Sequence, residues 1–124
     1  MKPQTIILGV AFTILGVATT AVAQQQTIPA QFQGKWDLDL ESCNSPVRPE
    51  GRLDISADRV EFYESGGLVQ KVVIHGNSDI ELSIELSGEG QTWISDNYFR
   101  LSDDQNSLTD LTNGNSGFVR YRCP

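Results

Sequence analysis

The sequence predicts an all-β domain: an antiparallel up-and-down barrel of about eight strands, or a flattened barrel or sandwich, closed by one disulfide. Apolar and polar residues alternate over many short runs, which is the period of a strand with one buried face. Turn-forming residues separate the runs, and no segment after residue 23 keeps the 3.6-residue apolar period of a helix. Consecutive strands joined by short turns usually pair, which favours the up-and-down order.

The alternation is clearest where Ile80, Leu82 and Ile84 fall on one face of a run and Glu81 and Glu85 on the other. Strands are expected at residues 31–40, 53–55, 60–62, 68–74, 80–86, 93–101, 108–112 and 118–123. The side chains expected inside the barrel are large and apolar: Phe32, Trp36, Leu38, Val60, Phe62, Val72, Ile74, Leu82, Ile84 and Phe99. Such side chains fill a small barrel or line a ligand cavity within it.

The N-terminal segment has the pattern of a cleavable signal peptide. Lys2 precedes an apolar run, and Ala21-Val22-Ala23 forms a small-residue cleavage site before Gln24. The run is barely long enough to cross a bilayer as an uncleaved anchor, and the cleavage site favours removal. Residues 1–23 are therefore predicted to be a signal peptide of the general secretory (Sec) type. Residues 24–124 then form one domain in the periplasm or outside the cell.

The cysteines are expected to form the disulfide, because two thiols in a small exported domain usually pair. Cys43 and Cys123 lie at the ends of the first and last expected strands. Those two ends belong to opposite rims of an eight-stranded meander, whereas bridged Cα atoms lie within about 7 Å of each other. Either residues 41–50, which include Pro46 and Pro49, fold back along the barrel wall, or the strand count is wrong by one. The irregular segment is long enough, and the fold-back is favoured.

The charge of the chain restricts its partners. The net charge is −7, and the predicted signal peptide contains one of the nine basic residues and none of the sixteen acidic ones, so the exported domain has a net charge of −8. A nucleic acid is an improbable partner, and an anionic membrane surface is equally unattractive because no basic cluster is present. The charge favours solubility or a basic protein partner. We expect a monomer.

No catalytic group is indicated by the sequence. The only histidine, His75, lies in a turn-forming His-Gly-Asn segment, and no Gly-x-Ser-x-Gly nucleophile motif occurs. Carboxylates such as Glu85, Glu89 and Asp96 could pair for glycosidic cleavage, but a chain rich in acids produces such pairs by chance. A non-enzyme without a cofactor is expected.

No metal site is expected either, because one histidine and two oxidised cysteines cannot hold zinc or copper. Asp and Asn residues near the C-terminus could bind calcium, although the same residues close hairpin turns and that interpretation is favoured. The residues in question are Asp103, Asp104, Asn106, Asp110, Asn113 and Asn115.

A glycine-flanked turn is the most distinctive candidate binding surface. The segment from Ser87 to Trp93 places Glu89, Gln91 and Trp93 around a flexible turn. A tryptophan at a binding surface offers a large area and a polar handle. The alternative, that Trp93 begins a core strand together with Phe99, is the favoured interpretation of that residue.

The segment Phe32-x-Gly34-x-Trp36 resembles the Gly-x-Trp signature of the calycins, which are lipocalin-like and avidin-like barrels. This resemblance implies that Trp36 plugs one barrel end and that a basic residue of the last strand, Arg120 or Arg122, packs over the indole. It also implies a small apolar ligand in the barrel mouth.

Two further resemblances concern function. The chain from Ile28 to Pro124 is similar to small exported bacterial proteins of unknown function, and Ser87-Gly88 resembles the Ser-Gly turn that periplasmic lysozyme inhibitors insert into the enzyme. We therefore expect a non-catalytic envelope protein that binds a small apolar ligand or an extracytoplasmic protein. The alternative is an inhibitor of a secreted enzyme such as lysozyme.

Overall fold

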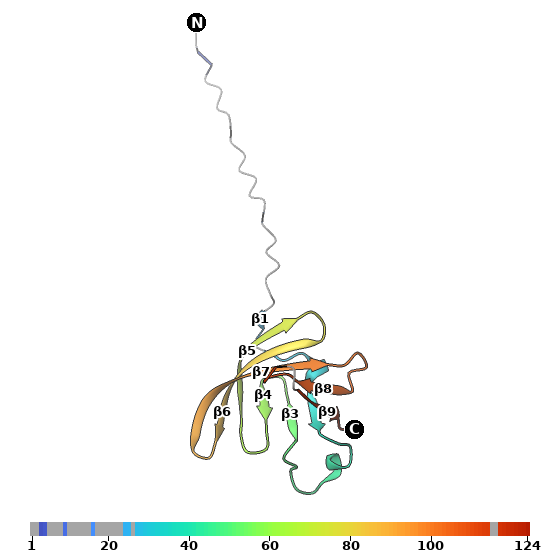
Figure 1. Cartoon of the computed structure of the whole chain (residues 1–124). Coiled ribbons are helices and arrows are strands. Elements are labelled where there is room, and N and C mark those ends of the chain that lie inside the picture. Colours follow the sequence, from blue (N-terminus) through green and yellow to red (C-terminus); the bar gives the residue numbers. More distant parts are fainter. Residues whose placement is uncertain (1–2, 5–8, 10–15, 17–23, 26, 115–116) are drawn as a thin grey trace.

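The computed structural model describes residues 3–4, 9, 16, 24–25, 27–114 and 117–124. Within these ranges the chain forms a closed antiparallel barrel of eight strands, β2 to β9, and a short strand, β1, beside β5 (Figure 1). The strands are β1 (Gln24–Gln25), β2 (Gly34–Asp37), β3 (Leu53–Ile55), β4 (Arg59–Glu61), β5 (Gly66–His75), β6 (Asp79–Gly88), β7 (Gln91–Leu101), β8 (Ser107–Asp110) and β9 (Phe118–Arg122), with 3₁₀ turns η1 (Ala30–Phe32) and η2 (Ser42–Asn44).

The all-β barrel predicted from the alternation is confirmed. Each barrel strand pairs with the next along the chain, and β2 pairs with β9 to close the ring. No helix among the described residues is long and apolar enough to cross a membrane. Most of the predicted signal peptide lies outside the described residues, so its cleavage remains a prediction.

The strands differ greatly in length, and this shapes the surface. β5, β6 and β7 each have ten or eleven residues, whereas the other barrel strands have three to five. β6 and β7 pair without a register shift from Asp79 and Arg100 to Gly88 and Gln91. Their turn consists of two residues with positive φ, Glu89 and Gly90, as a tight type I′ hairpin requires.

Apolar side chains fill the interior of the barrel. The buried cluster is Ile28, Phe32, Trp36, Leu53, Ile55, Val60, Val72, Ile80, Leu82, Ile84, Leu86, Phe99, Leu101 and Leu108. Phe62 and Ile74, which were expected inside, pack against this cluster and are partly buried. The expectation for Leu38 is wrong, since its side chain is 45% exposed. The first barrel strand, β2, ends at Asp37, so the apolar alternation that continues to Leu40 in the sequence belongs to a loop.

The loop after β2 folds back along the outside of the barrel, as the disulfide requires. The Cys43–Cys123 bond is present, with the two Cα atoms 5.5 Å apart. Lys35 of β2 joins both ends of the bridge: its Nζ donates to the carbonyl of Cys43 (3.1 Å), and its carbonyl accepts from the amide of Cys123 (2.8 Å). The eight-strand count and the disulfide are therefore compatible.

A buried ion pair lies beneath this loop. Arg52 Nε is 2.9 Å from Asp37 Oδ2, and the two side chains are 10% and 1% exposed. Arg52 also donates from Nη2 to the carbonyl of Ser42 (2.6 Å), which ties η2 to the barrel wall. The pair lies where β2 ends, and the loop that follows covers it.

We expect the double substitution Cys43→Ser and Cys123→Ser to lower the free energy of unfolding by roughly 4 kcal/mol. The bond closes a loop with a sequence separation of 80, and opening it restores the conformational entropy of the unfolded chain. Urea denaturation of the full chain with and without the substitutions measures the change. An unchanged unfolding midpoint would contradict this structural role.

Asp37→Ala should cost about 3–5 kcal/mol, because it leaves the Arg52 charge buried without its partner. The matched control is Asp54→Ala, which removes the partner of Arg48 from a pair whose side chains are 34% and 36% exposed. That substitution should cost less than about 1 kcal/mol. The measurement is again urea denaturation, and equal losses for the two variants would show that burial does not decide the outcome.

Candidate functional site

One end of the barrel is closed around Trp36. The guanidinium carbon of Arg122 lies 4.2 Å from the centroid of the indole, and the indole Nε1 donates to the carbonyl of Phe32 (3.0 Å). Both terminal nitrogens of Arg122 donate to carbonyls around the η1 turn that precedes β2: Nη1 to Gln33 and Nη2 to Gln31, each at 2.7 Å. The arginine therefore binds the indole face and the turn together, which favours a rigid barrel end.

Arg120 occupies a different environment from Arg122. It is buried, lies 4.6 Å over the ring of Phe118, and pairs with Asp110 at 3.3 Å. Its Nε donates to the carbonyl of Gly51 (2.6 Å), and burial lowers the pKa of the guanidinium. Of the two basic residues considered for the barrel-end plug, Arg122 packs over Trp36 and Arg120 ties β9 to the end of the loop that covers β2.

The Ser87–Trp93 hairpin keeps its residues at the surface. Glu89 and Gln91 are exposed, and Trp93 is 41% exposed. The favoured interpretation of Trp93 as a core residue is therefore wrong. Trp93 pairs with Leu86 and shares its face of the sheet, but β8 pairs with β7 only from Phe99 onward, so no described strand covers the indole.

The outer sides of the three long strands form a second candidate surface, which we call the β5–β7 face. Cross-strand register aligns Lys71 with Ser83 and Asp96, and Val73 with Glu81 and Tyr98. The face comprises Leu68, Lys71, Val73 and His75 from β5, Asp79, Glu81, Ser83 and Glu85 from β6, and Ile94, Asp96, Tyr98 and Arg100 from β7.

A groove with a volume of about 530 Å³ lies on this face. Its floor includes Lys71, Glu81, Asp96 and Tyr98, and the segment 111–114 forms a wall. The wall is attached directly to β7, since the amide of Leu111 donates to the carbonyl of Tyr98 (2.8 Å) and the amide of Tyr98 donates to Thr112 Oγ1 (3.1 Å). The groove therefore combines charged, hydroxyl and aromatic groups on the outside of the barrel.

A hydrogen-bonded network closes one end of the face. Tyr98 donates from its hydroxyl to Asp79 Oδ2 (2.6 Å), and Arg100 donates to both carboxylate oxygens of Asp79 at 2.9 Å. The Arg100 hydrogen bonds, followed by that from Tyr98, lower the pKa of Asp79. The hydrogen bond to Asp79 raises the pKa of Tyr98. The phenol is thus held protonated beside an ionised carboxylate.

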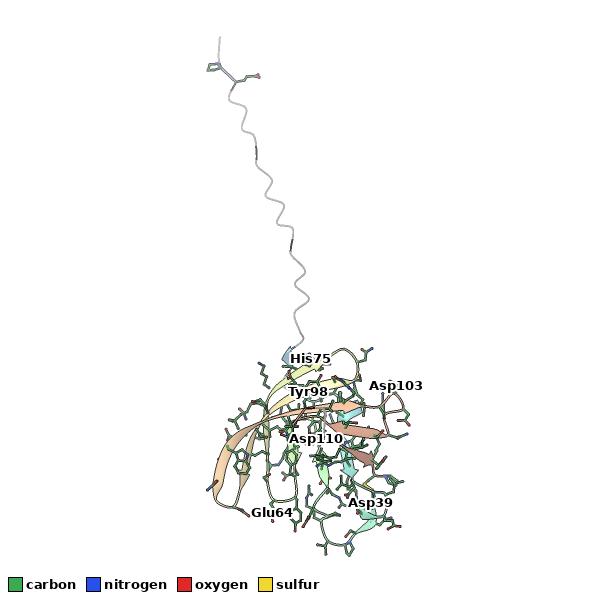
Figure 2. All side chains as sticks on the ribbon, viewed as in Figure 1. Asp39, Glu64, His75, Tyr98, Asp103 and Asp110 are labelled. Atoms are coloured by element: carbon green, nitrogen blue, oxygen red, sulfur yellow. A yellow bond between two sulfur atoms is a disulfide. The ribbon has the colours of Figure 1, made fainter. Side chains whose placement is uncertain are left out.

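His75 belongs to the same end of the face, where Figure 2 shows it close to Tyr98. The two rings stack with centroids 5.9 Å apart, and His75 Nε2 lies 2.8 Å from Glu81 Oε2. Among the described residues, the hydrogen bonds of the imidazole include no hydroxyl or thiol that could act as a nucleophile. The pair therefore supports the face structurally and forms no nucleophile–base arrangement.

Acidic side chains near the C-terminus accept hydrogen bonds from neighbouring residues of their own turns. Asp104 Oδ1 accepts from Ser102 Oγ (2.7 Å) and from the amide of Asn106 (3.0 Å), and these bonds lower the pKa of Asp104. Asp110 accepts from the amide of Thr112 and pairs with Arg120. The described part of the chain contains no group of three or more His, Cys, Asp or Glu residues that could hold a metal ion. Asn115 lies outside the described residues.

The chain matches no protein-family model, and the searches of curated proteins and of solved structures returned no significant match.

Asp79→Asn should lower the pKa of Tyr98 toward the ordinary value of about 10, because the carboxylate that retains the phenolic proton is lost. Ultraviolet absorbance of the phenolate across an alkaline titration measures the change, and Tyr98→Phe identifies which transition belongs to this residue. In the unchanged protein, the stabilisation from the raised Tyr98 pKa is full below the unfolded pKa and disappears as pH rises through the folded pKa. A Tyr98 transition that does not respond to Asp79→Asn would exclude the coupling.

Proposed function

We propose that this chain is an exported, non-catalytic binding protein that recognises another extracytoplasmic protein through the β5–β7 face. The main support for the proposal is the location of the groove. Side chains fill the barrel interior, whereas a groove of about 530 Å³ lies on the outer face. The protein acts as a monomer, without a cofactor, in the periplasm or outside the cell.

A protein partner is favoured over a small apolar ligand. Pockets for such ligands are enclosed and lined mainly by apolar side chains. Here apolar side chains such as Phe32 and Phe99, each 0% exposed, fill the barrel interior, where such a ligand would bind. The outer groove carries Lys71 and Asp96 at its surface, which suits a polar, extended partner better than an apolar small molecule.

The partner is expected to be basic at its contact surface. Glu85 and Asp96 are exposed on the β5–β7 face, and no salt bridge within the described structure involves either of them. The exported domain carries a net charge of −8 after removal of the predicted signal peptide. Opposite charge on the partner would speed association and select against other acidic envelope proteins.

Inhibition of a secreted enzyme such as a lysozyme is the second candidate. It is favoured by the exposed hairpin, in which Ser87 and Thr92 share a hydrogen bond of 3.1 Å at the base of the tight Glu89-Gly90 turn. A rigid, narrow turn can enter an enzyme cleft with little loss of conformational entropy. An acidic inhibitor also complements a basic enzyme.

Charge reversal tests the proposed surface. The full chain with a C-terminal affinity tag is expressed in its source cell, and the processed N-terminus, expected at Gln24, is read by mass spectrometry. We expect Asp96→Lys to reduce the amount of specifically captured envelope protein by at least about tenfold, since it opposes a basic partner. Asp103→Lys makes the same charge change on an exposed turn that does not line the groove and should leave capture intact.

The same preparations distinguish the alternatives. Equal capture by the two variants would exclude the β5–β7 face, and an unprocessed N-terminus would exclude export by cleavage. Lysozyme activity measured with excess protein tests the inhibitor hypothesis. Absence of inhibition at micromolar concentration would eliminate lysozyme as the target.

A further inference from the structure

We infer that the partner binds by adding a β-strand to the edge of β7 between Gln91 and Asn97, and that the added strand is an extended segment with a basic and an apolar residue two positions apart on one face. This inference rests on the proposed function and specifies its binding mode. It depends on three features of β7: a difference in strand length, the direction of its backbone groups, and the charge beside them.

The edge arises because β7 is much longer than its neighbour on one side. β6 pairs with β7 from Gln91 to Arg100, whereas β8 pairs with β7 only from Phe99 to Leu101. Within the described residues, no strand lies on the β8 side of Gln91–Asn97. On β5, by contrast, the edge beyond β4 is occupied, since Val69 donates to the carbonyl of Asp58 and β1 pairs with Val72 and Val73.

The backbone groups along this edge alternate in direction. The amide of Leu101 donates toward β6, to the carbonyl of Ser78, whereas the amide and carbonyl of Tyr98 point to the other side, toward Thr112 and Leu111. The register between β6 and β7 is continuous. The N–H and C=O groups of Asp96, Ile94 and Thr92 therefore point to the same side as those of Tyr98. Among the described backbone bonds, none satisfies these groups.

The contacts at Tyr98 show how an added strand would begin. Leu111 already supplies one donor to β7, and Thr112 supplies one acceptor. The chain then turns away from β7, and a 3.0 Å hydrogen bond from the amide of Gly114 to the carbonyl of Leu111 closes this turn. A strand that enters through the groove meets Asp96 next and reaches Thr92 within a few residues. Such a ladder provides affinity through main-chain hydrogen bonds and specificity through alternate side chains.

The side chains along the edge select a basic and apolar partner. Asp96 and Ile94 lie on the outer face, two residues apart, and Ile94 is 57% exposed. A strand paired here would place a Lys or Arg opposite Asp96 and an apolar residue opposite Ile94, the favourable cross-strand combinations. A second copy of this chain is a poor occupant, because it would bring two acidic domains together edge to edge.

Hydrogen exchange followed by NMR tests the edge in the full chain. Amides of Trp93, Ser95 and Asn97, which donate toward β6, should exchange at least about tenfold more slowly than those of Thr92, Ile94 and Asp96. A capped six-residue peptide, Thr-Lys-Thr-Val-Thr-Lys, which we call the Lys-Val peptide, presents Lys and Val on one face of a strand. It should slow exchange at Thr92, Ile94 and Asp96 by about tenfold or more. Its ester analogue, which has the same side chains but lacks backbone N–H donors, should have little effect.

Ile94→Pro provides the matching change in the protein. The N–H of Ile94 faces away from β6, and proline is tolerated at such a position of an edge strand. The hydrogen bonds between β6 and β7 therefore remain, while the edge loses the N–H donor at its centre. Binding of the Lys-Val peptide should weaken by at least about tenfold, whereas Ile94→Thr, which keeps the N–H, should weaken it less. If the proline variant unfolds, the peptide and ester comparison on the unchanged protein decides.

Several results would overturn the inference: uniform protection along residues 92–97 in the free monomer, protection caused by a dimer of this chain, or equal effects of the peptide and its ester analogue. Capture of the natural partner separates the two proposals. If Ile94→Pro captures it as well as the unchanged protein does, strand addition fails and the proposed function stands. If the unchanged protein captures no specific partner while the peptide binds the edge, the proposed function fails.

Discussion

The pairing of β2 with β9 closes the barrel, and the rest of the structure depends on this short seam. Only two residue pairs form it, Trp36 with Arg122 and Asp37 with Tyr121. So short a ladder joins segments that are distant in the sequence and must offset a large loss of chain entropy. Three other interactions reinforce it: the Cys43–Cys123 bond, the Arg122 guanidinium on the Trp36 indole, and the hydrogen bond from Cys123 to Lys35.

The short seam on one side of the barrel accompanies long strands on the other. The loop that carries Cys43 covers the outside of β2 and buries the Asp37–Arg52 pair, so this wall presents a covering loop to solvent. β5, β6 and β7 extend beyond their short neighbours, and this leaves both an uncovered face and an unaccompanied stretch of β7. The proposed binding surface therefore follows from the inequality of strand lengths around the barrel.

The sequence predicted the features that depend on local periodicity or on simple chemistry. The alternation at Ile80, Leu82 and Ile84 identified β6 because each of these side chains is buried. The predicted signal peptide favoured pairing of the two cysteines, and the structure contains that disulfide. The predicted burial of Leu38 and Trp93 was wrong because the exposure of each side chain depends on where the strands of the folded barrel end. Leu38 is exposed because β2 ends at the buried Asp37, and Trp93 because β8 is short.

The β5–β7 face was not predicted, although its polar residues were visible in the alternation at Glu81, Ser83 and Glu85. A polar outer face is expected of any half-buried strand. The groove and the Tyr98–Asp79 hydrogen bond require the register of β6 against β7 and the path of residues 111–114, which no local pattern encodes. Residues 19 positions apart in the sequence meet there.

An exposed strand edge is ordinarily a risk of aggregation, and the acidic character of the chain bears directly on that risk. Folded proteins protect such edges with charge, twist or a covering segment. Here Asp96 lies on the edge itself, with Glu85 beside Ile94 on β6 and Glu89 in the adjoining turn. Carboxylates in these positions repel a second copy of the same edge and attract a basic strand. One set of charges can therefore keep the free protein monomeric and select its partner, and both effects would weaken together as salt screens them.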